Sequence, residues 1–114
     1  MNNKKTSMPL EVRENMRGGN GAIRLQHLLQ PEDSCGKLRL AAELLMKPGT
    51  SVGPHEHGPD AELYIITEGT LTVDDNGETV ECTAGDIVFT GGGAFHSIAN
   101  HSDSDVKLYA IVIN

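Results

Sequence analysis

Short runs in which apolar and polar residues alternate, each closed by glycine or another turn-forming residue, occupy most of this chain. The clearest run covers residues 37–47, where Leu38, Leu40, Ala42, Leu44 and Met46 share one parity. Successive side chains of a β-strand point to opposite faces, so a period of two predicts a strand with one buried face. The residue types of this run also suit a helix, but its alternation and its end at Pro48-Gly49 favour the strand.

Further alternating or β-rich runs follow the same pattern. We expect strands at residues 23–30, 63–67, 71–74, 79–83, 87–90, 95–100 and 106–113. Asp75-Asn76-Gly77 lies between two of them and is a strong hairpin signal, and 13 glycines suit a chain with many tight turns. No segment has a convincing pattern of an amphipathic helix of ordinary length. Many short strands joined by turns predict an all-β sandwich or barrel.

The chain has 114 residues, which is the size of one domain with a single modest core. We interpret residues 1–20 as an N-terminal arm or tail and residues 21–114 as the β-barrel domain. Within the arm, Met8, Leu10 and Val12 have the parity of a short strand. Two interpretations stay open: an arm strand that pairs with another subunit, or a loosely ordered terminus.

The acidic balance of the chain limits its partners. The formal net charge is -7 and the isoelectric point is near 5.0, which argues against binding to nucleic acid or to an anionic membrane surface. A small anionic ligand stays compatible, because a bound metal ion can reverse the field inside one pocket. The polar N-terminus does not resemble a signal peptide and no run of about 18 apolar residues occurs, so we expect no membrane span and a cytoplasmic location. Cys35 and Cys82 are expected to be free thiols, since small secreted scaffolds usually carry more cysteines.

Two glycine-framed segments carry the strongest chemical signal. The first contains His55, His57 and Glu62, and the second contains His96. His55 and His57 are two residues apart, so both imidazoles point to one side of an extended backbone. Neutral imidazole and carboxylate suit first-row divalent metals, and three or four of them can leave coordination positions open for a substrate. We predict that the four side chains converge on one metal ion inside a closed β-structure; the alternative is four unrelated surface polar groups.

These segments resemble the two sequence motifs of the cupins. The first motif, G(X)5HXH(X)3–4E(X)6G, is matched by Gly49, His55, His57, Glu62 and Gly69. The second motif, G(X)5PXG(X)2H(X)3N, is matched by Gly85, Gly93, His96 and Asn100, with Gly91 in place of the family's proline. That change removes a rigid turn from the loop before His96 and leaves every predicted ligand in place. The motifs and the short link between them cover residues 49–100.

The resemblance implies a cupin double-stranded β-helix, or jelly-roll barrel, made of two antiparallel sheets. It implies that His55, His57, Glu62 and His96 bind one divalent ion, commonly manganese, iron, nickel or zinc. Among cupins the chain most resembles the small single-domain group often labelled oxalate decarboxylase-like, a label that does not establish an activity.

Several side chains near the motifs have both a structural and a functional interpretation. Tyr64 and Ile66 share the parity of Glu62, so both are expected near the cavity, and Ile98 beside His96 is expected in its wall. Tyr64 is either a hydrogen-bond donor to a substrate or a structural tyrosine. His27 lies on the apolar parity of its strand, which favours a core or interface histidine over a substrate contact.

The remaining polar residues have simple structural interpretations. Arg24 and Arg39 have the solvent-facing parity of their strands, so neither is expected inside the barrel. Asp60 is interpreted as a turn residue and Asn100 as a side chain that braces its own turn.

Two function hypotheses from different classes follow. In the first, the chain is a metal-dependent enzyme of decarboxylase or dioxygenase type that acts on a small polar or carboxylate-bearing molecule, with Glu62 and Tyr64 as candidate catalytic residues. In the second, a non-catalytic protein uses the metal to bind or sense a small ligand. The full ligand set disfavours a storage role without metal. Leu45, Tyr109, Ile111 and Ile113 leave apolar residues on both faces of their strands, which predicts a homodimer.

Overall fold

The computed structural model describes residues 1–114 as ten strands with three short 3-10 turns. The strands are β1 (Leu10–Glu14), β2 (Ala22–His27), β3 (Leu38–Met46), β4 (Ser51–His57), β5 (Ala61–Glu68), β6 (Leu71–Asp75), β7 (Glu78–Cys82), β8 (Ile87–Thr90), β9 (Ala94–Ala99) and β10 (Val106–Ile113). The turns are η1 (Lys5–Ser7), η2 (Met16–Gly18) and η3 (Pro31–Ser34), and no helix is long and apolar enough to cross a membrane. The all-β prediction is confirmed. Residues 38–46 form the strand β3, so the strand interpretation of residues 37–47 is correct and the helix interpretation is wrong.

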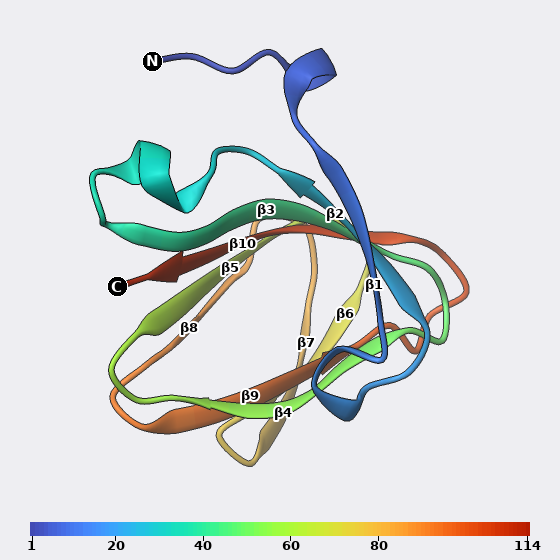
Figure 1. The fold of residues 1–114 in the computed structure, drawn as a ribbon. Coiled ribbons are helices and arrows are strands. Elements are labelled where there is room, and N and C mark those ends of the chain that lie inside the picture. Colours follow the sequence, from blue (N-terminus) through green and yellow to red (C-terminus); the bar gives the residue numbers. More distant parts are fainter.

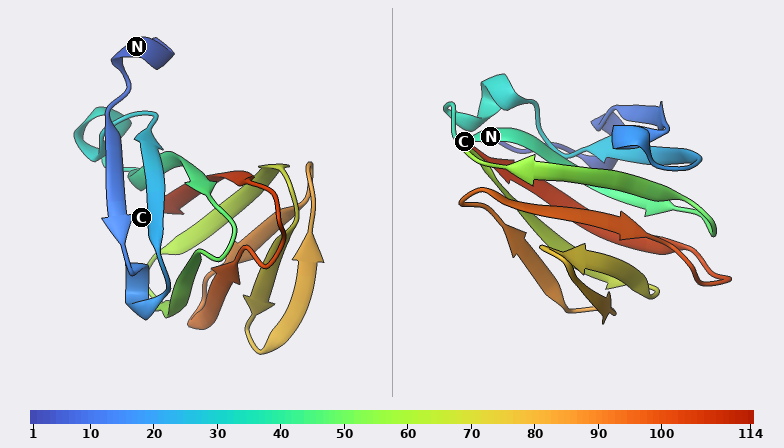
Figure 2. Two further views of the ribbon diagram at one scale, coloured as in Figure 1. Left: turned by 90° about the vertical axis from the view of Figure 1, so that its right-hand side faces the viewer. Right: turned by 90° about the horizontal axis from the view of Figure 1, so that it is seen from below.

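Two antiparallel sheets face each other across the core (Figure 1). The larger sheet has the order β1-β2-β3-β10-β5-β8 and the smaller has the order β4-β9-β6-β7. Figure 2 shows the chain passing from one sheet to the other several times, so that strands distant in sequence become neighbours. This arrangement brings β4 and β9 of the smaller sheet opposite β5 of the larger one, and these three strands carry the predicted metal ligands.

The core consists of 16 buried residues supplied by both sheets. Leu25, Leu44 and Leu108 come from the larger sheet, and they pack with Val73 and Ile98 from the smaller one. Burying a side chain of this size contributes about 1.5–3 kcal/mol, so the alternation read from the sequence supplies most of the driving force for the two-layer arrangement.

The burial of individual side chains tests two further expectations from the sequence. Ile66 and Ile98 were expected near the cavity, but both belong to the apolar core and neither lines the cavity described below. Cys82 is buried and Cys35 is exposed, and both are free thiols as predicted.

The edge strand β1 pairs with β2 of the same chain, from Leu10 opposite Gln26 to Glu14 opposite Ala22. Residues 10–14 are therefore an ordered edge strand of the larger sheet. Glu11 accepts hydrogen bonds from the Arg13 guanidinium at 2.9 and 3.1 Å, and its Oε1 lies 2.7 Å from Nε2 of His27. His27 is thus a satisfied structural histidine, as the sequence favoured. The division of the chain at residue 20 stays a prediction.

Replacing Glu11 with glutamine is expected to weaken the attachment of β1 in a pH-dependent way. Hydrogen bonds from Arg13 and then His27 lower the pKa of Glu11 from 4.5 to about 2. Because the folded pKa lies below the unfolded one, this stabilisation is complete above about pH 4.5 and is lost as the pH falls toward 2. The pair is partly exposed, so the expected loss in free energy of unfolding is below about 1 kcal/mol near pH 6.

The measurement is urea unfolding of the wild type and Glu11→Gln near pH 6 and near pH 3. The difference in free energy of unfolding between the wild type and Glu11→Gln should be smaller near pH 3 than near pH 6. Glu14→Gln is the matched control, since Glu14 lies on the same strand and makes no ion pair. An equal difference at both pH values would contradict the assignment.

Asn100 braces the turn between β9 and β10, as predicted. Its Nδ2 donates to the carbonyl oxygens of Met46 at 2.9 Å and Ser104 at 2.8 Å, and its Oδ1 accepts from the backbone and the hydroxyl of Ser102. The side chain is completely buried, so these hydrogen bonds hold the end of β9 against the end of β3. They thereby help to fix the position of β9, the strand that carries His96.

Candidate metal centre

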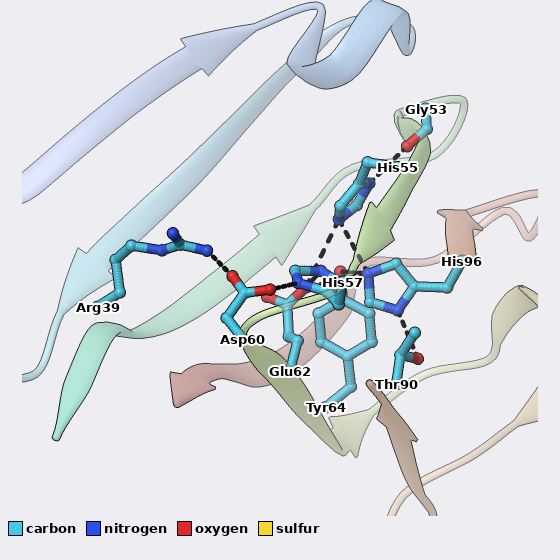
Figure 3. A network of polar contacts seen from close by, with 9 residues as sticks. All are labelled: Arg39, Gly53, His55, His57, Asp60, Glu62, Tyr64, Thr90 and His96. Atoms are coloured by element: carbon cyan, nitrogen blue, oxygen red, sulfur yellow. Dashed lines mark hydrogen bonds and ion pairs between the residues drawn. The ribbon is translucent and has the colours of Figure 1, made fainter. Parts of the chain in front are cut away.

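The four predicted metal ligands meet between the two sheets (Figure 3). His55 and His57 project from β4, His96 from β9 and Glu62 from β5. In the pairing of β4 with β9, His55 stands directly opposite His96. The register shifts between Val52 and His55, so β4 carries one extra residue there, and such a bulge changes the direction of the side chains that follow.

The donor atoms are spaced as they would be around one cation. Nε2 of His96 lies 2.9 Å from Nε2 of His55 and 3.0 Å from Oε1 of Glu62. Nε2 of His57 lies 3.1 Å from the same carboxylate oxygen, and Nε2 of His55 lies 3.6 Å from it. Ligands about 2.1 Å from a metal are about 3.0 Å apart at right angles and about 3.4 Å apart at the tetrahedral angle. The cluster can therefore hold a divalent ion.

The outer nitrogen of each imidazole is already used by another group. Nδ1 of His55 lies 2.8 Å from the Gly53 carbonyl oxygen, and Nδ1 of His57 lies 3.0 Å from Oδ1 of Asp60. Both partners only accept, so the ring proton is on Nδ1 and the lone pair of Nε2 faces the centre. Nδ1 of His96 lies 2.9 Å from the hydroxyl of Thr90. Lone pairs and a carboxylate directed at one point repel each other unless a cation lies between them, so the donor set fits a metal.

Burial and neighbouring charges set the protonation of the cluster. Burial raises the pKa of Glu62, but the His55 and His96 imidazoles packed against its carboxylate outweigh this effect and bring the pKa to about 2. Desolvation lowers the pKa of His57, which favours the neutral imidazole that a metal needs. An ionised carboxylate beside neutral imidazoles is the protonation state of a ready ligand set.

Tyr64 lies against the cluster, as its parity predicted. Its ring stacks on His96 with 4.9 Å between centroids, and its hydroxyl is 3.4 Å from Nε2 of His96. Burial, and then the charge of Glu62, raise the pKa of Tyr64 well above its usual value, while the charge of Arg17 opposes the rise. The phenol therefore stays protonated and acts as a donor rather than a base.

Asp60 and Arg39 correct two sequence interpretations. Asp60 was interpreted as a turn residue, but it is buried, binds Nδ1 of His57 and pairs with the Arg39 guanidinium (Figure 3). Arg39 was expected on the solvent-facing side of its strand, and its side chain is 58% exposed, but it also lines the cavity beside the predicted metal ligands. In the pairing of β3 with β10, Leu38 and Leu40 face successive residues, so Arg39 has no partner and sits in a β-bulge. The bulge breaks the period of two on which the expectation depended.

Asp60→Asn is expected to weaken divalent metal binding about 10- to 100-fold, because the carboxylate fixes the tautomer of His57 and increases its basicity. Competition with a metal-binding fluorescent dye measures the affinity. Asp33→Asn removes the same charge from the exposed turn η3 and should leave the affinity unchanged. Equal affinities of the wild type and Asp60→Asn would remove Asp60 from the site.

A cavity of about 340 Å³ opens on the cluster. Besides His55, His57, Glu62 and Tyr64, its wall includes apolar side chains from both sheets and three of the chain's four arginines, Arg13, Arg17 and Arg39. Sequence reasoning missed all three. Arg13 and Arg17 lie in the segment interpreted as an arm, and no local pattern in that segment indicates that it returns to the barrel.

Comparison with known proteins decides the family. Residues 42–112 match the cupin domain family. The chain belongs to the cupin family. This cupin is 42% identical to the oxalate-binding protein of Thermotoga maritima over 99 residues, which cover 87% of this chain and 82% of the relative.

Solved structures agree with the jelly-roll fold. A crystal structure described as a predicted oxalate decarboxylase from Thermotoga maritima superposes with a TM-score of 0.93 at 39% identity, covering 99% of this cupin and 98% of that chain. A polyketide cyclase from Streptomyces resistomycificus shares the fold at 21% identity, with a TM-score of 0.78 and coverage of 99% and 78%. The predicted fold and the predicted family are confirmed.

Proposed function

We propose that this cupin binds a small dicarboxylate, with oxalate as the first candidate, at one divalent metal ion held by His55, His57, Glu62 and His96. The observation that carries the proposal is the convergence of three imidazole Nε2 atoms and one carboxylate oxygen at the cavity. A divalent ion of the manganese, iron, nickel or zinc type would accept carboxylate oxygens of the ligand in its open positions. The names given to the Thermotoga maritima matches support oxalate as the first ligand to test.

The charges in the cavity support binding of an anion. Beyond the metal ligands, the titratable groups that line it are Tyr64 and three arginines. A neutral phenol and guanidinium groups donate hydrogen bonds, and none of them is a base near neutral pH. Such donors suit the carboxylate oxygens of a ligand, whereas a general base would have to come from the ligand set itself.

A metal-dependent decarboxylase or dioxygenase is the second candidate. The observation in its favour is the Tyr64 hydroxyl, 3.4 Å from Nε2 of His96 and within reach of a ligand on the cavity side of the cluster. In this candidate Glu62 and Tyr64 are the catalytic residues. The phenol would donate a hydrogen bond to a developing negative charge, while Glu62 would remain a metal ligand or exchange a proton.

The experiment begins with elemental analysis of protein purified without added metal, followed by loading with the ion found. Calorimetric titration with oxalate then compares loaded and metal-free protein, with acetate as a monocarboxylate control. Metal-dependent binding of oxalate supports the proposal, and absence of any dicarboxylate binding to loaded protein rejects it. Release of carbon dioxide from oxalate, with and without dioxygen, separates the enzyme from the binding protein.

We also propose that a second copy covers the outer face of the larger sheet. Strand register places Ile65 beside Ile87 and Tyr109, and places Leu63 beside Phe89 and Ile111. Ile87 and Phe89 are each 58% exposed, which is unusual for such residues on a monomer. Light scattering on a sizing column is expected to give twice the mass of the chain; a monomer at all concentrations would remove the claim. The cytoplasmic location stays a prediction from the sequence.

A further inference from the structure

The three arginines that line the cavity differ in their partners. Arg13 forms two hydrogen bonds with Glu11, and Arg39 pairs with Asp60. Arg17 forms no side-chain hydrogen bond and no ion pair with any residue of the chain, although it lines the same cavity as Tyr64 and the predicted metal ligands. Arg17 is therefore the one cation of the cavity wall whose charge no carboxylate of the protein neutralises.

The backbone at Arg17 is held in an unfavourable conformation. Its φ of 54° and ψ of 30° lie in the left-handed region, which an arginine adopts at a cost in free energy. The surrounding loop keeps it there: the amide of Ser51 donates to the Asn20 carbonyl oxygen, and the amide of Asn20 donates to the Ser51 hydroxyl. The fold thus holds η2 against β4, the strand that carries His55 and His57.

With a divalent metal ion bound, the cavity would have two positive charges that no carboxylate of the protein neutralises. Glu11 neutralises Arg13, and Asp60 neutralises Arg39. A carboxylate that binds a divalent ion cancels one of its two charges, so with Glu62 as a ligand one positive charge remains at the metal, and Arg17 supplies a second one. A dicarboxylate would balance both charges, whereas a monocarboxylate would leave one of them without a partner.

We propose that Arg17 binds the ligand carboxylate charge that the metal ion does not neutralise, and thereby sets a preference of the cavity for dianions over monoanions. The inference rests on the proposed function, since it assumes a ligand oxyanion at the metal. A guanidinium presents parallel N–H donors that match both oxygens of a carboxylate. Arg17 is a specificity residue that touches the ligand and takes no part in holding the metal.

The test compares metal-loaded wild type, Arg17→Gln and Arg24→Gln by calorimetric titration with oxalate and with oxamate, in which an amide replaces one carboxylate. Arg17→Gln is expected to weaken oxalate binding about 10- to 100-fold and oxamate binding less than about threefold. Arg24→Gln is the matched control, because Arg24 is exposed on β2 outside the cavity and carries the same charge. It should change neither affinity.

A second variant separates ligand contact from folding. Arg17→Asn keeps a residue that tolerates the left-handed conformation, so its thermal midpoint should equal or exceed that of the wild type. Its metal content should match that of the wild type while its oxalate affinity falls as in Arg17→Gln. A loss of metal or of thermal stability in both variants would assign Arg17 a structural role and overturn the inference.

The remaining outcomes distinguish this inference from the proposed function. If loaded wild type does not bind oxalate, the same proteins are titrated with malonate and succinate. Equal affinity of wild type and Arg17→Gln for a dicarboxylate that binds overturns the role of Arg17 alone. Failure of every dicarboxylate to bind loaded protein overturns the proposed function and this inference together.

Discussion

Replacement of His55 with alanine is expected to lower divalent metal affinity by more than about 100-fold. Loss of a group that only orients a ligand lowers affinity about 10- to 100-fold, and loss of a ligand itself should exceed that range. In the wild type, metal at 100 times its dissociation constant stabilises the folded state by about 2.7 kcal/mol, which raises the thermal midpoint by about 10 °C. The variant should show almost none of this rise at the same metal concentration.

Two further variants make the result specific. His101→Ala removes an exposed imidazole that lies outside the cluster, so it should bind metal as the wild type does. Glu62→Gln keeps the volume of the buried side chain but removes its charge, and it should weaken metal binding as strongly as His55→Ala. Elemental analysis and dye competition measure both effects. Full metal content in His55→Ala and Glu62→Gln would mean that the ion, if any, binds elsewhere.

Gly53→Ala is expected to destabilise the fold by about 3 kcal/mol, in the range of substitutions that overpack a close contact. A Cβ at Gly53 would overlap with the carbonyl oxygen of Arg17, and a Cβ at Gly19 would overlap with the carbonyl oxygen of Ser51. The backbones of η2 and β4 pass each other at these two glycines with no space for a methyl group. Relief of the overlap requires η2 to move away from the strand that carries His55.

Gly58→Ala is the matched control, because a Cβ there would meet no atom within 4 Å and the backbone needs no left-handed conformation. Urea unfolding measures the loss of stability, and titration with metal and oxalate measures the effect on the site. Because Arg17 moves with η2, oxalate affinity should fall more than metal affinity in the part of the protein that stays folded. Equal stability of Gly53→Ala and Gly58→Ala would show that the two segments are not in close contact.

The main architecture was predictable because its signals are local. The period of two in residues 37–47 and 106–113 becomes β3 and β10, with bounds that differ from the prediction by a residue or two. The strand predicted at residues 23–30 is shorter in the structure, since β2 ends at His27. Parity puts His55 and His57 on one side of their strand, and the spacing of the two motifs adds Glu62 and His96. The structure places all four in one cluster.

The features that went unpredicted depend on departures from local regularity. Parity correctly predicted an exposed Arg39, but it did not predict that Arg39 also lines the cavity. The pairing of β3 with β10 places Arg39 in a β-bulge, and the alternation of residue types along β3 does not indicate a bulge. Asp60 looked like a turn residue because its partners, His57 and Arg39, come from different strands.

By itself, the sequence determined an all-β cupin and the four side chains that could hold a metal ion, because strand period and motif spacing act over short stretches of the chain. Only the tertiary structure decided that the N-terminal segment pairs with β2 and places Arg13 and Arg17 in the wall of the cavity. That placement depends on contacts between backbones more than thirty residues apart, such as Gly53 against Arg17, and glycine leaves no local pattern that names its distant neighbour.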